Sequence, residues 1–321
     1  MLITILLFAF GLVCLIKGGD WFVDGSTGVA RRFHLPELLI GATIVSIGTT
    51  LPEVMVSTTS ALTGHGEIAY GNALGSIICN TALIAAITIT VKPAPVNRSA
   101  LGVPVFFFFL SAFVYVGVAY FSGYFSRFVG LALLAIFVAH MIVAVMQMKK
   151  APVESQDLEN DETGKSLGKN IFLLIIGAAL IAVGADLLVE NGTLIAQALG
   201  VPESVIALTL VALGTSLPEL VTAITSLLKG HGALSLGNII GANLFNLVLV
   251  TGVSASLAPF SVPQSSMLFG YNSSLVLDIP VMFAVMLLMT VPALIRGKLF
   301  RVQGILLLLT YAAFCMIQFS L

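Results

Sequence analysis

Charged side chains are scarce in this chain of 321 residues. Asp, Glu, Lys and Arg make up 9% of the sequence, whereas soluble domains carry about 25%. Hydrophobic residues make up 58% and recur in long runs from end to end, which excludes a soluble domain held by one anchor. The net charge is −1 without a basic tract, so nothing indicates nucleic acid as a partner. The sequence therefore predicts an all-α polytopic membrane protein in contact with lipid.

Cysteine is also rare. The three cysteines, Cys14, Cys79 and Cys315, lie in separate apolar segments, and their spacing indicates neither a disulfide framework nor a zinc site. We expect no cofactor. Residues 2–16 have no basic segment before them and no small-residue cleavage motif after them, so we interpret them as part of a first membrane span and not as a signal peptide.

Ten apolar segments have the length of membrane spans. They lie near residues 2–22, 36–62, 67–90, 101–121, 126–148, 170–190, 203–228, 233–258, 274–294 and 302–320. One long polar stretch separates the first five from the last five. We therefore expect a first five-helix repeat at 1–148, a linker at 149–169 and a second repeat at 170–321. About twenty residues cannot build a hydrophobic core, so the linker is expected to be a solvated connection.

The basic residues predict the orientation. If the N-terminus faces outwards, thirteen of the fourteen Lys and Arg residues fall on the inner side, and Arg127 alone falls outside. This asymmetry follows the positive-inside rule, and one missed or added span would scatter it. We expect a multi-pass protein of the cell's inner (plasma) membrane, with both termini outside and the linker in the cytoplasm. The sequence leaves the oligomeric state open, a monomer included.

The two halves of the chain repeat each other. Adding 166 to a residue number maps 20–80 onto 186–246 without a gap, and 20 of the 45 positions that start at Pro36 are identical. Because each half holds an odd number of spans, the halves are expected to sit upside down relative to each other. Inverted repeats are typical of secondary transporters, whose site lies near mid-membrane between the repeats and is built by broken helices.

The most distinctive repeated motif is Gly-Thr-[Thr/Ser]-Leu-Pro-Glu, which ends at Glu53 and again at Glu219. Both carboxylates fall at mid-span, where a charge costs about 2.5–3.5 kcal/mol, and no Lys or Arg lies at a matching depth. A bound cation is therefore the expected partner. The hydroxyls three and four residues earlier share the helix face of the carboxylate. The proline is expected to distort each helix and free carbonyls near Ser46 and Ala212. Such oxygen ligands suit calcium and sodium.

A second repeated motif, Gly-Asn-x-x-Gly-[Ser/Ala]-x-x-x-Asn, ends at Asn80 and at Asn246. Its glycines allow helices to pack closely, which is the simplest explanation of Gly71 and Gly237 and of the glycine four residues after each. The amides are harder to explain by packing, because amide groups deep in lipid need polar partners. We therefore predict that Ser76, Asn80 and Asn246 line the same site.

The paired motifs resemble those of the cation/calcium antiporter superfamily, in particular bacterial sodium/calcium exchanger-like proteins. The resemblance covers nearly the whole chain. It implies exchange of Ca²⁺ for Na⁺, with Glu53 and Glu219 as central calcium ligands and the first and sixth helices as a sliding gate that Asp20 and Asp186 help to shape. The ligand set implied by the resemblance comprises Glu53, Glu219, Thr49, Thr50, Thr215, Ser216, Ser76, Asn80, Asn246 and the backbone carbonyls of Ser46 and Ala212.

The chain departs from this family pattern in two places. Ala242 stands where the first repeat has Ser76, and Asn246 stands where some relatives carry an acid, so the second half offers fewer oxygen ligands and the expected number of sodium sites changes. The proton-coupled branch usually has Gly-Asn-x-x-Glu in its first motif, whereas this chain has Gly-Thr, which favours sodium.

Three alternatives differ in class from a sodium-coupled exchanger. Protonated carboxylates could carry hydrogen ions through the same site, so a proton-coupled calcium antiporter stays open. A calcium-permeable channel fits less well, because pores usually close a ring of subunits or repeats around a continuous axis. An intramembrane hydrolase fits least, since we identify no nucleophile–histidine pair and no metal-ligating histidine in the spans. We therefore do not expect an enzyme.

Overall fold

The computed structural model describes residues 1–150, 167–200, 214–264 and 267–320. Within these residues, nine helices are long and apolar enough to span a membrane: Leu2–Arg32, Glu37–Leu62, Gly66–Val91, Arg98–Phe121, Arg127–Lys149, Leu167–Ala198, Gly232–Leu257, Ser274–Arg296 and Arg301–Gln318. They correspond to nine of the ten predicted spans. The other predicted span, 203–228, is described only from residue 214 onwards, and most of the predicted linker also lies outside the described residues.

Several of the long helices consist of shorter segments. The helical elements are α1 (Leu2–Arg32), α2 (Glu37–Ile40), η1 (Gly41–Val45), α3 (Ser46–Leu62), α4 (Gly66–Cys79), η2 (Asn80–Ala85), α5 (Ala86–Val91), α6 (Arg98–Phe121), α7 (Arg127–Lys150), α8 (Leu167–Ala198), α11 (Leu217–Leu228), α12 (Gly232–Phe245), η4 (Asn246–Val250), α13 (Thr251–Leu257), η5 (Ser274–Asp278), α14 (Ile279–Arg296) and α15 (Arg301–Ser320). The described part of the chain also has four two-residue strands: β1 (Tyr124–Phe125) pairs with β2 (Phe260–Ser261), and β3 (Met267–Leu268) pairs with β4 (Tyr271–Asn272).

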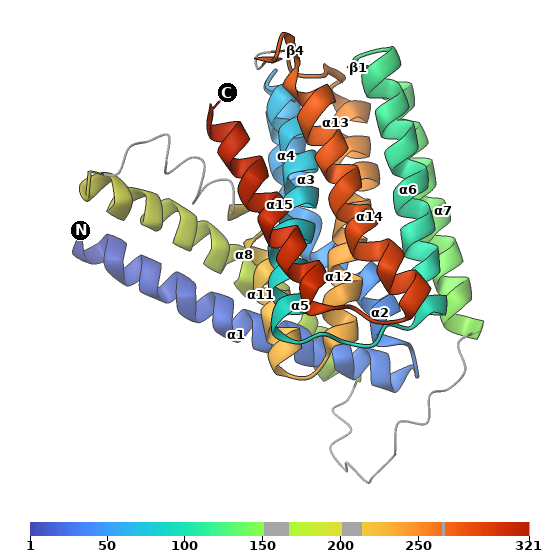
Figure 1. The fold of residues 1–321 in the computed structure, drawn as a ribbon. Helices are drawn as coiled ribbons and strands as arrows, with labels where there is room; N and C mark the ends of the chain where they lie inside the picture. Colours follow the sequence, from blue (N-terminus) through green and yellow to red (C-terminus); the bar gives the residue numbers. More distant parts are fainter. Residues whose placement is uncertain (151–166, 201–213, 265–266, 321) are drawn as a thin grey trace.

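The helices α1 and α8 lie side by side and project from one side of the main bundle (Figure 1). Glycines form their contact. A Cβ atom on Gly11 would lie 3.0 Å from the carbonyl oxygen of Gly184, and one on Gly18 would lie 3.0 Å from that of Gly177. The two helices are therefore antiparallel. The 166-residue offset relates Gly11 to Gly177 and Gly18 to Gly184, so the two contacts are reciprocal, as at a two-fold interface.

At the centre of the main bundle lies α12. Every residue from Leu234 to Phe245 is buried. A Cβ atom on Gly237 would overlap the carbonyl oxygen of Leu38, and one on Gly241 would overlap the Ser46 hydroxyl, so α12 packs backbone to backbone against α2, η1 and the start of α3. The predicted packing role agrees with this contact for Gly237 and Gly241. It is wrong for Gly71 and Gly75, where an added Cβ atom would meet nothing within 4 Å.

Among the described residues, four π-helical turns interrupt the long helices, and two of them start at equivalent residues of the two halves. These are η2 at Asn80 and η4 at Asn246. Turns of this kind are frequent at functional sites, because they displace backbone groups from the regular ladder. The irregular backbone therefore coincides with the second repeated motif.

The expected helix break at the first proline is wrong. The helix α3 runs through Pro52 without interruption, and the irregular turn η1 ends at Val45, two turns earlier. In the second copy, Thr215 and Ser216 form a turn directly before α11, in which Pro218 is the second residue. Proline removes one hydrogen bond, but a membrane helix keeps its path where the surrounding helices support it.

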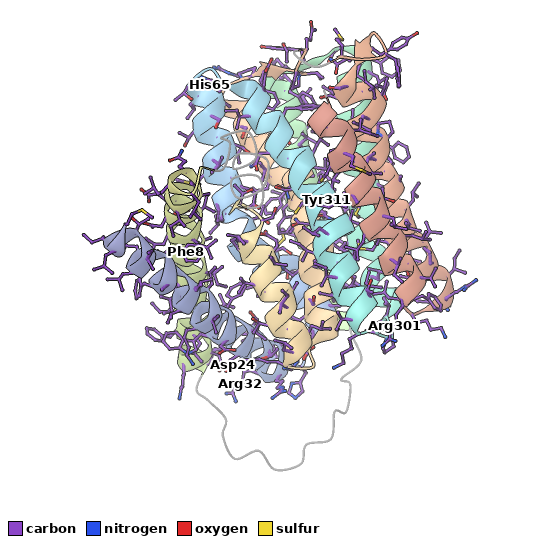
Figure 2. All side chains as sticks on the ribbon, turned by 60° about the vertical axis from the view of Figure 1, so that its left-hand side comes forward. Phe8, Asp24, Arg32, His65, Arg301 and Tyr311 are labelled. Atoms are coloured by element: carbon purple, nitrogen blue, oxygen red, sulfur yellow. The ribbon has the colours of Figure 1, made fainter. Side chains whose placement is uncertain are left out.

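Basic residues gather at one end of the molecule. Arg32 and Arg301 lie at the same end as Asp24, and His65 lies at the opposite end (Figure 2). The helix α7 ends at Lys150 and α8 begins at Leu167, so both helices extend slightly into the predicted linker, 149–169.

Candidate ion-binding site

Glu53 and Glu219 are fully buried, each with 0% of its surface exposed. Their carboxylate oxygens have no hydrogen-bond partner among the described residues. The two groups are close enough to repel each other when both are ionised. Glu219 lies in the first turn of α11, where the helix dipole favours a negative charge. A buried pair of this kind requires a compensating cation or protons.

Buried hydroxyl groups surround the carboxylates. Thr50 and Ser216, one from each half of the chain, are at most 1% exposed, and their hydroxyls have no partner among the described residues. The side chains of Thr49 and Thr50 lie next to the carboxylate of Glu219, so the first half faces the acid of the second. Hydroxyls with free lone pairs beside a carboxylate are suitable ligands for a hard cation.

Two asparagines that we did not predict as site residues hold the other threonines. Thr49 donates a hydrogen bond to Oδ1 of Asn238 over 3.1 Å, and Thr215 donates one to Oδ1 of Asn72 over 3.2 Å. The 166-residue offset relates the two threonines to each other and the two asparagines to each other, so these bonds are reciprocal as well. Asn72 also donates to the Ser57 hydroxyl over 2.8 Å. Both asparagines stand in the second repeated motif, which was the available signal.

Ser46 anchors the start of α3. Its hydroxyl lies 2.7 Å from the carbonyl oxygen of Gly41 and 2.9 Å from that of Asn238. The predicted ligand is its own backbone carbonyl, which the Thr49 hydroxyl approaches to 3.5 Å. Ala212, the equivalent residue of the second half, lies outside the described residues.

Asn80 and Asn246 are fully buried, and neither amide has a partner among the described residues. Ser76 is 4% exposed and precedes Asn80 by one helical turn, which places both on the same face. Ala242 is buried at the equivalent position and offers no side-chain oxygen. The neighbouring Asn243 donates to Thr81 over 2.7 Å, so its amide nitrogen serves as a contact between the halves.

The donor atoms of this region are hydroxyl, amide and carboxylate oxygens. Within the described part of the chain, no group of three or more His, Cys, Asp and Glu residues could hold a metal ion. The arrangement favours a hard cation such as calcium or sodium.

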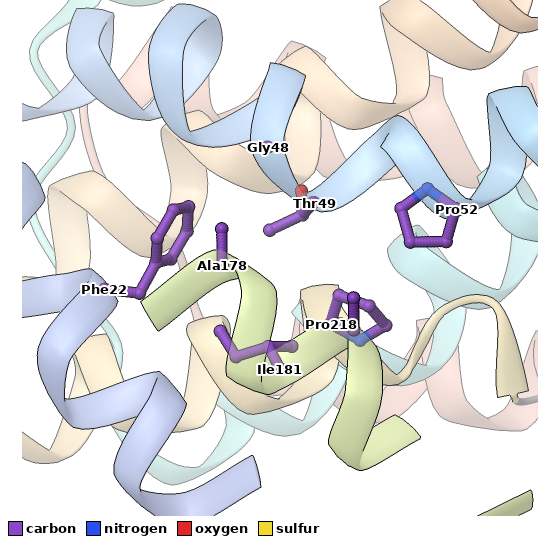
Figure 3. Close-up of a pocket in the computed structure, with 8 residues that line it drawn as sticks. Phe22, Gly48, Thr49, Pro52, Ala178, Ile181 and Pro218 are labelled. Atoms are coloured by element: carbon purple, nitrogen blue, oxygen red, sulfur yellow. The ribbon is translucent and has the colours of Figure 1, made fainter. Parts of the chain in front are cut away.

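A narrow cleft lies beside the acids, between the α1–α8 pair and the main bundle. Its lining comes from α1, α3, α8 and α11, as Figure 3 shows. The lining residues are Phe22, Gly48, Thr49, Pro52, Ala178, Ile181, Ala182 and Pro218. Because Thr49 belongs both to this lining and to the hydroxyl set, the cleft adjoins the candidate ligands.

One histidine inside a span escaped the sequence reasoning. His140 of α7 is fully buried, and neither ring nitrogen has a hydrogen-bond partner among the described residues. Its ring lies 5.2 Å from that of Phe107 and 6.0 Å from that of Phe245. A lone histidine packed on aromatic rings, without a nucleophile or acid bonded to it, has neither hydrolase nor metal-site geometry.

Comparison with known proteins identifies the family. The sequence model described as "Sodium/calcium exchanger protein" matches residues 3–146 and 169–320, which is most of both halves. This chain belongs to the sodium/calcium exchanger family. It is therefore a multi-pass membrane protein of a transporter family and not an enzyme, and its family transports calcium and sodium without a cofactor.

Similar proteins span nearly the same length. The sodium/calcium exchanger MaX1 of Methanosarcina acetivorans is 29% identical over 361 residues, with 99% of each chain covered. The inner membrane protein YrbG of Escherichia coli is 34% identical, with 89% of each covered. A structure of the sodium-calcium exchanger NCX_Mj soaked with Na⁺ and Sr²⁺ superposes with a TM-score of 0.81 at 30% identity, and 97% of each chain is covered.

The asparagine–threonine bonds give a first testable prediction for this exchanger-family protein. Replacing Asn238 by Ala leaves the Thr49 hydroxyl without its partner and free to turn away from Glu219. We expect calcium binding to the purified protein to weaken about tenfold, the effect of losing one buried hydrogen bond. Asn97→Ala, which removes a cap at the start of α6, is the control and should leave calcium binding unchanged. Equal binding by both variants would contradict the role of Asn238.

Proposed function

We propose that this protein is a secondary active antiporter that exchanges Ca²⁺ for Na⁺ by alternating access at a site built around Glu53 and Glu219. One observation carries the proposal: the fully buried carboxylates of Glu53 and Glu219 have no hydrogen-bond partner among the described residues, and neither has the buried Thr50 hydroxyl that lies next to Glu219. Buried polar groups in native proteins are nearly always paired. Unpaired groups gathered from both halves of the chain indicate a missing charged ligand.

The charge of the site supports exchange. Two carboxylates balance one calcium ion, and sodium ions can use the same oxygens. If the two loaded states compete for one site, binding of sodium ejects calcium, and the coupling needs no second site. The soaking ions of the NCX_Mj structures, Na⁺ with Sr²⁺ or Ca²⁺, are consistent with such a shared site in a similar protein.

The proposed architecture is ten spans in two inverted five-helix repeats. It is supported by the reciprocal glycine contacts between α1 and α8 and by the reciprocal bonds of Thr49 and Thr215. The cluster of Arg32 and Arg301 at one end, away from His65, supports a cytoplasmic position for that end (Figure 2). We propose that both termini face outwards, that the linker is cytoplasmic, and that the protein lies in the inner membrane.

The gate in this proposal is the α1–α8 pair. Its close glycine contacts join α1 to α8, so the two helices can move together as one unit. It lies against the cleft that contains Thr49. Movement of the pair would therefore open the acids to one side of the membrane and then to the other.

The decisive experiment is calcium flux into proteoliposomes with imposed ion gradients. We expect calcium uptake to require an opposing sodium gradient and to stop when sodium is replaced by potassium. Uptake driven by a proton gradient alone would favour the proton-coupled antiporter. Uptake that continues without any opposing cation gradient would favour the channel and would exclude antiport.

A further inference from the structure

Lys229, at the end of α11, ties this helix to α1. Its Nζ lies 2.8 Å from Oδ1 of Asp24 and 3.4 Å from Oδ1 of Asp20, and it donates a hydrogen bond to the backbone carbonyl of Asp20 over 2.9 Å. The three side chains are 26%, 39% and 38% exposed, in the order Lys229, Asp24 and Asp20. One cation therefore bridges two acids on a neighbouring helix in a partly shielded position.

Close helix packing continues this contact towards the middle of the membrane. A Cβ atom on Gly19 would lie 2.7 Å from Cγ1 of Val221 and 2.8 Å from the Thr225 hydroxyl. Since Thr225 precedes Lys229 by four residues, the packing and the ion pair lie along one face of α11. At this end of the molecule, α1 thus covers α11.

The equivalent position in the other half lacks the cation. The 166-residue offset relates Lys229 to Thr63, Asp20 to Asp186 and Asp24 to Glu190. The two acids are kept, but the lysine is replaced by a threonine. Asp186 and Glu190 are both exposed, and within the described residues neither forms an ion pair.

The helix packing differs between the two halves in the same way as the ion pair: the α1–α11 contact is tighter than the equivalent α8–α3 contact. Val221 and Thr225 are partly buried, whereas their counterparts Met55 and Thr59 on α3 are exposed, Met55 by 66%. The helix α8 therefore does not cover α3 as α1 covers α11. The α1–α11 contact is therefore closed at the end that holds Lys229, whereas the equivalent α8–α3 contact at the opposite end is open.

We propose that Lys229, Asp20 and Asp24 form a latch that holds α1 on α11 and favours the state closed at the cytoplasmic end and open to the outside. This inference rests on the alternating access proposed above. To reach the opposite state, α1 must leave α11, which breaks the ion pair. When α8 then covers α3, no equivalent ion pair forms, because Thr63 carries no charge. The latch therefore stabilises one of the two states only.

A neighbouring ion pair has a different role. His231 and Glu37 lie 2.7 Å apart and join the start of α12 to the start of α2. These helices pack backbone to backbone within the main bundle. Their contact stays intact when α1 moves, so it does not distinguish the two states.

The expected effect of the latch is a change in sidedness. Lys229→Met keeps the apolar stem and removes the charge. Because partly exposed ion pairs contribute little, we expect the equilibrium to shift by about two- to fivefold. Apparent calcium affinity scales with the population of the competent state, so it should rise by close to that factor from the cytoplasmic side and fall by a smaller factor from the outside, where the competent state is the major one. Calcium-dependent exchange in right-side-out and inside-out vesicles measures both. A variant with a damaged site would lose affinity on both sides.

Matched variants come from the repeat itself. Thr63→Lys would give the opposite state an ion pair with Asp186 and Glu190 when α8 covers α3, so it should shift both affinities in the same direction as Lys229→Met. Asp20→Asn should act like Lys229→Met, while Glu190→Gln should leave both affinities unchanged. A shift of the same sign on both sides, or none for Lys229→Met, would overturn the latch.

A second readout does not depend on antiport. Cysteines placed at Val221 and Met55 report the two contacts by their rates of modification with a thiol reagent, measured against the parent protein. In the Lys229→Met background we expect faster modification at 221 and slower modification at 55. Unchanged modification rates at both positions would reject the latch, whichever ion proves to be coupled to calcium. A shift in the rates without sodium-coupled calcium flux would reject the proposed function but not the latch.

Discussion

Replacing Glu53 or Glu219 by glutamine should abolish sodium-driven calcium uptake while the protein still inserts and folds. Each substitution keeps the shape of a fully buried side chain and removes one of the two negative charges at the site. A calcium ion would then face one charge where it needs two, and losing one member of a buried charge pair costs about 2–5 kcal/mol. We therefore expect calcium affinity to fall by about a hundredfold or more.

The same two variants should be at least as stable as the parent protein when no calcium is present. A buried carboxylate without a partner destabilises a membrane protein, and glutamine removes that charge. Thermal melting of the detergent-solubilised protein measures this, and addition of calcium should stabilise only the parent. Glu67→Gln, an exposed glutamate beyond the end of α3, is the matched control and should keep both uptake and calcium stabilisation. Full uptake by either Glu53→Gln or Glu219→Gln would exclude the assigned site.

The membrane spans could be predicted from hydropathy because lipid imposes length and apolarity on every span. For the second predicted span, the expected 36–62 and the observed Glu37–Leu62 agree closely. The first helix runs on to Arg32, ten residues beyond its predicted end. The part beyond residue 22 contains Asp24, Arg31 and Arg32. These charges end the apolar run on which the prediction rests, but the helix continues through them to Arg32. Hydropathy reports what lipid can cover, and helix ends depend on capping and packing.

The acids of the site were predictable because a repeated charge inside an apolar run has few explanations. The structure buries Glu53 and Glu219 and brings them close enough for their charges to interact. Asn72 and Asn238 were not assigned to the site, because their bonds join residues 143 and 189 positions apart in the chain. Such partners follow from the packing of distant helices, of α12 on α3 for Asn238 and of α4 beside the start of α11 for Asn72, and spacing along the chain does not encode this packing.

The irregular turns show the same limit. Proline is the strongest local signal for a helix break, yet α3 continues through Pro52, while π-helical turns begin at Asn80 and Asn246. A π-helical turn needs one extra residue per turn and has no side-chain signature of its own. Its position is set by the neighbouring helices, and here it falls at two buried asparagines whose amides have no partner among the described residues.

Substituting Gly237 by alanine should both destabilise the protein and suppress transport. The added methyl group would overlap the backbone carbonyl of Leu38, and a backbone atom in a packed helix cannot move aside as a flexible side chain would. Overpacking of this kind costs about 1–3 kcal/mol, and α12 would have to separate from α2. Asn238 is the next residue, so this separation would also draw its amide away from Thr49. We expect a lower melting temperature and a loss of sodium-driven uptake of about tenfold or more.

Gly117 of α6 provides the control for this substitution. A Cβ atom there meets nothing within 4 Å, so Gly117→Ala adds the same methyl group in open space. Alanine is a better helix former than glycine by about 1 kcal/mol, so this variant should melt at or above the temperature of the parent and transport normally. If Gly237→Ala behaved like Gly117→Ala, α12 could not approach α2 as closely as the structure has it. The proposed link between the α12–α2 contact and the candidate site through Asn238 would then be rejected as well. Loss of transport in Gly237→Ala, with normal transport in Gly117→Ala, would support that link.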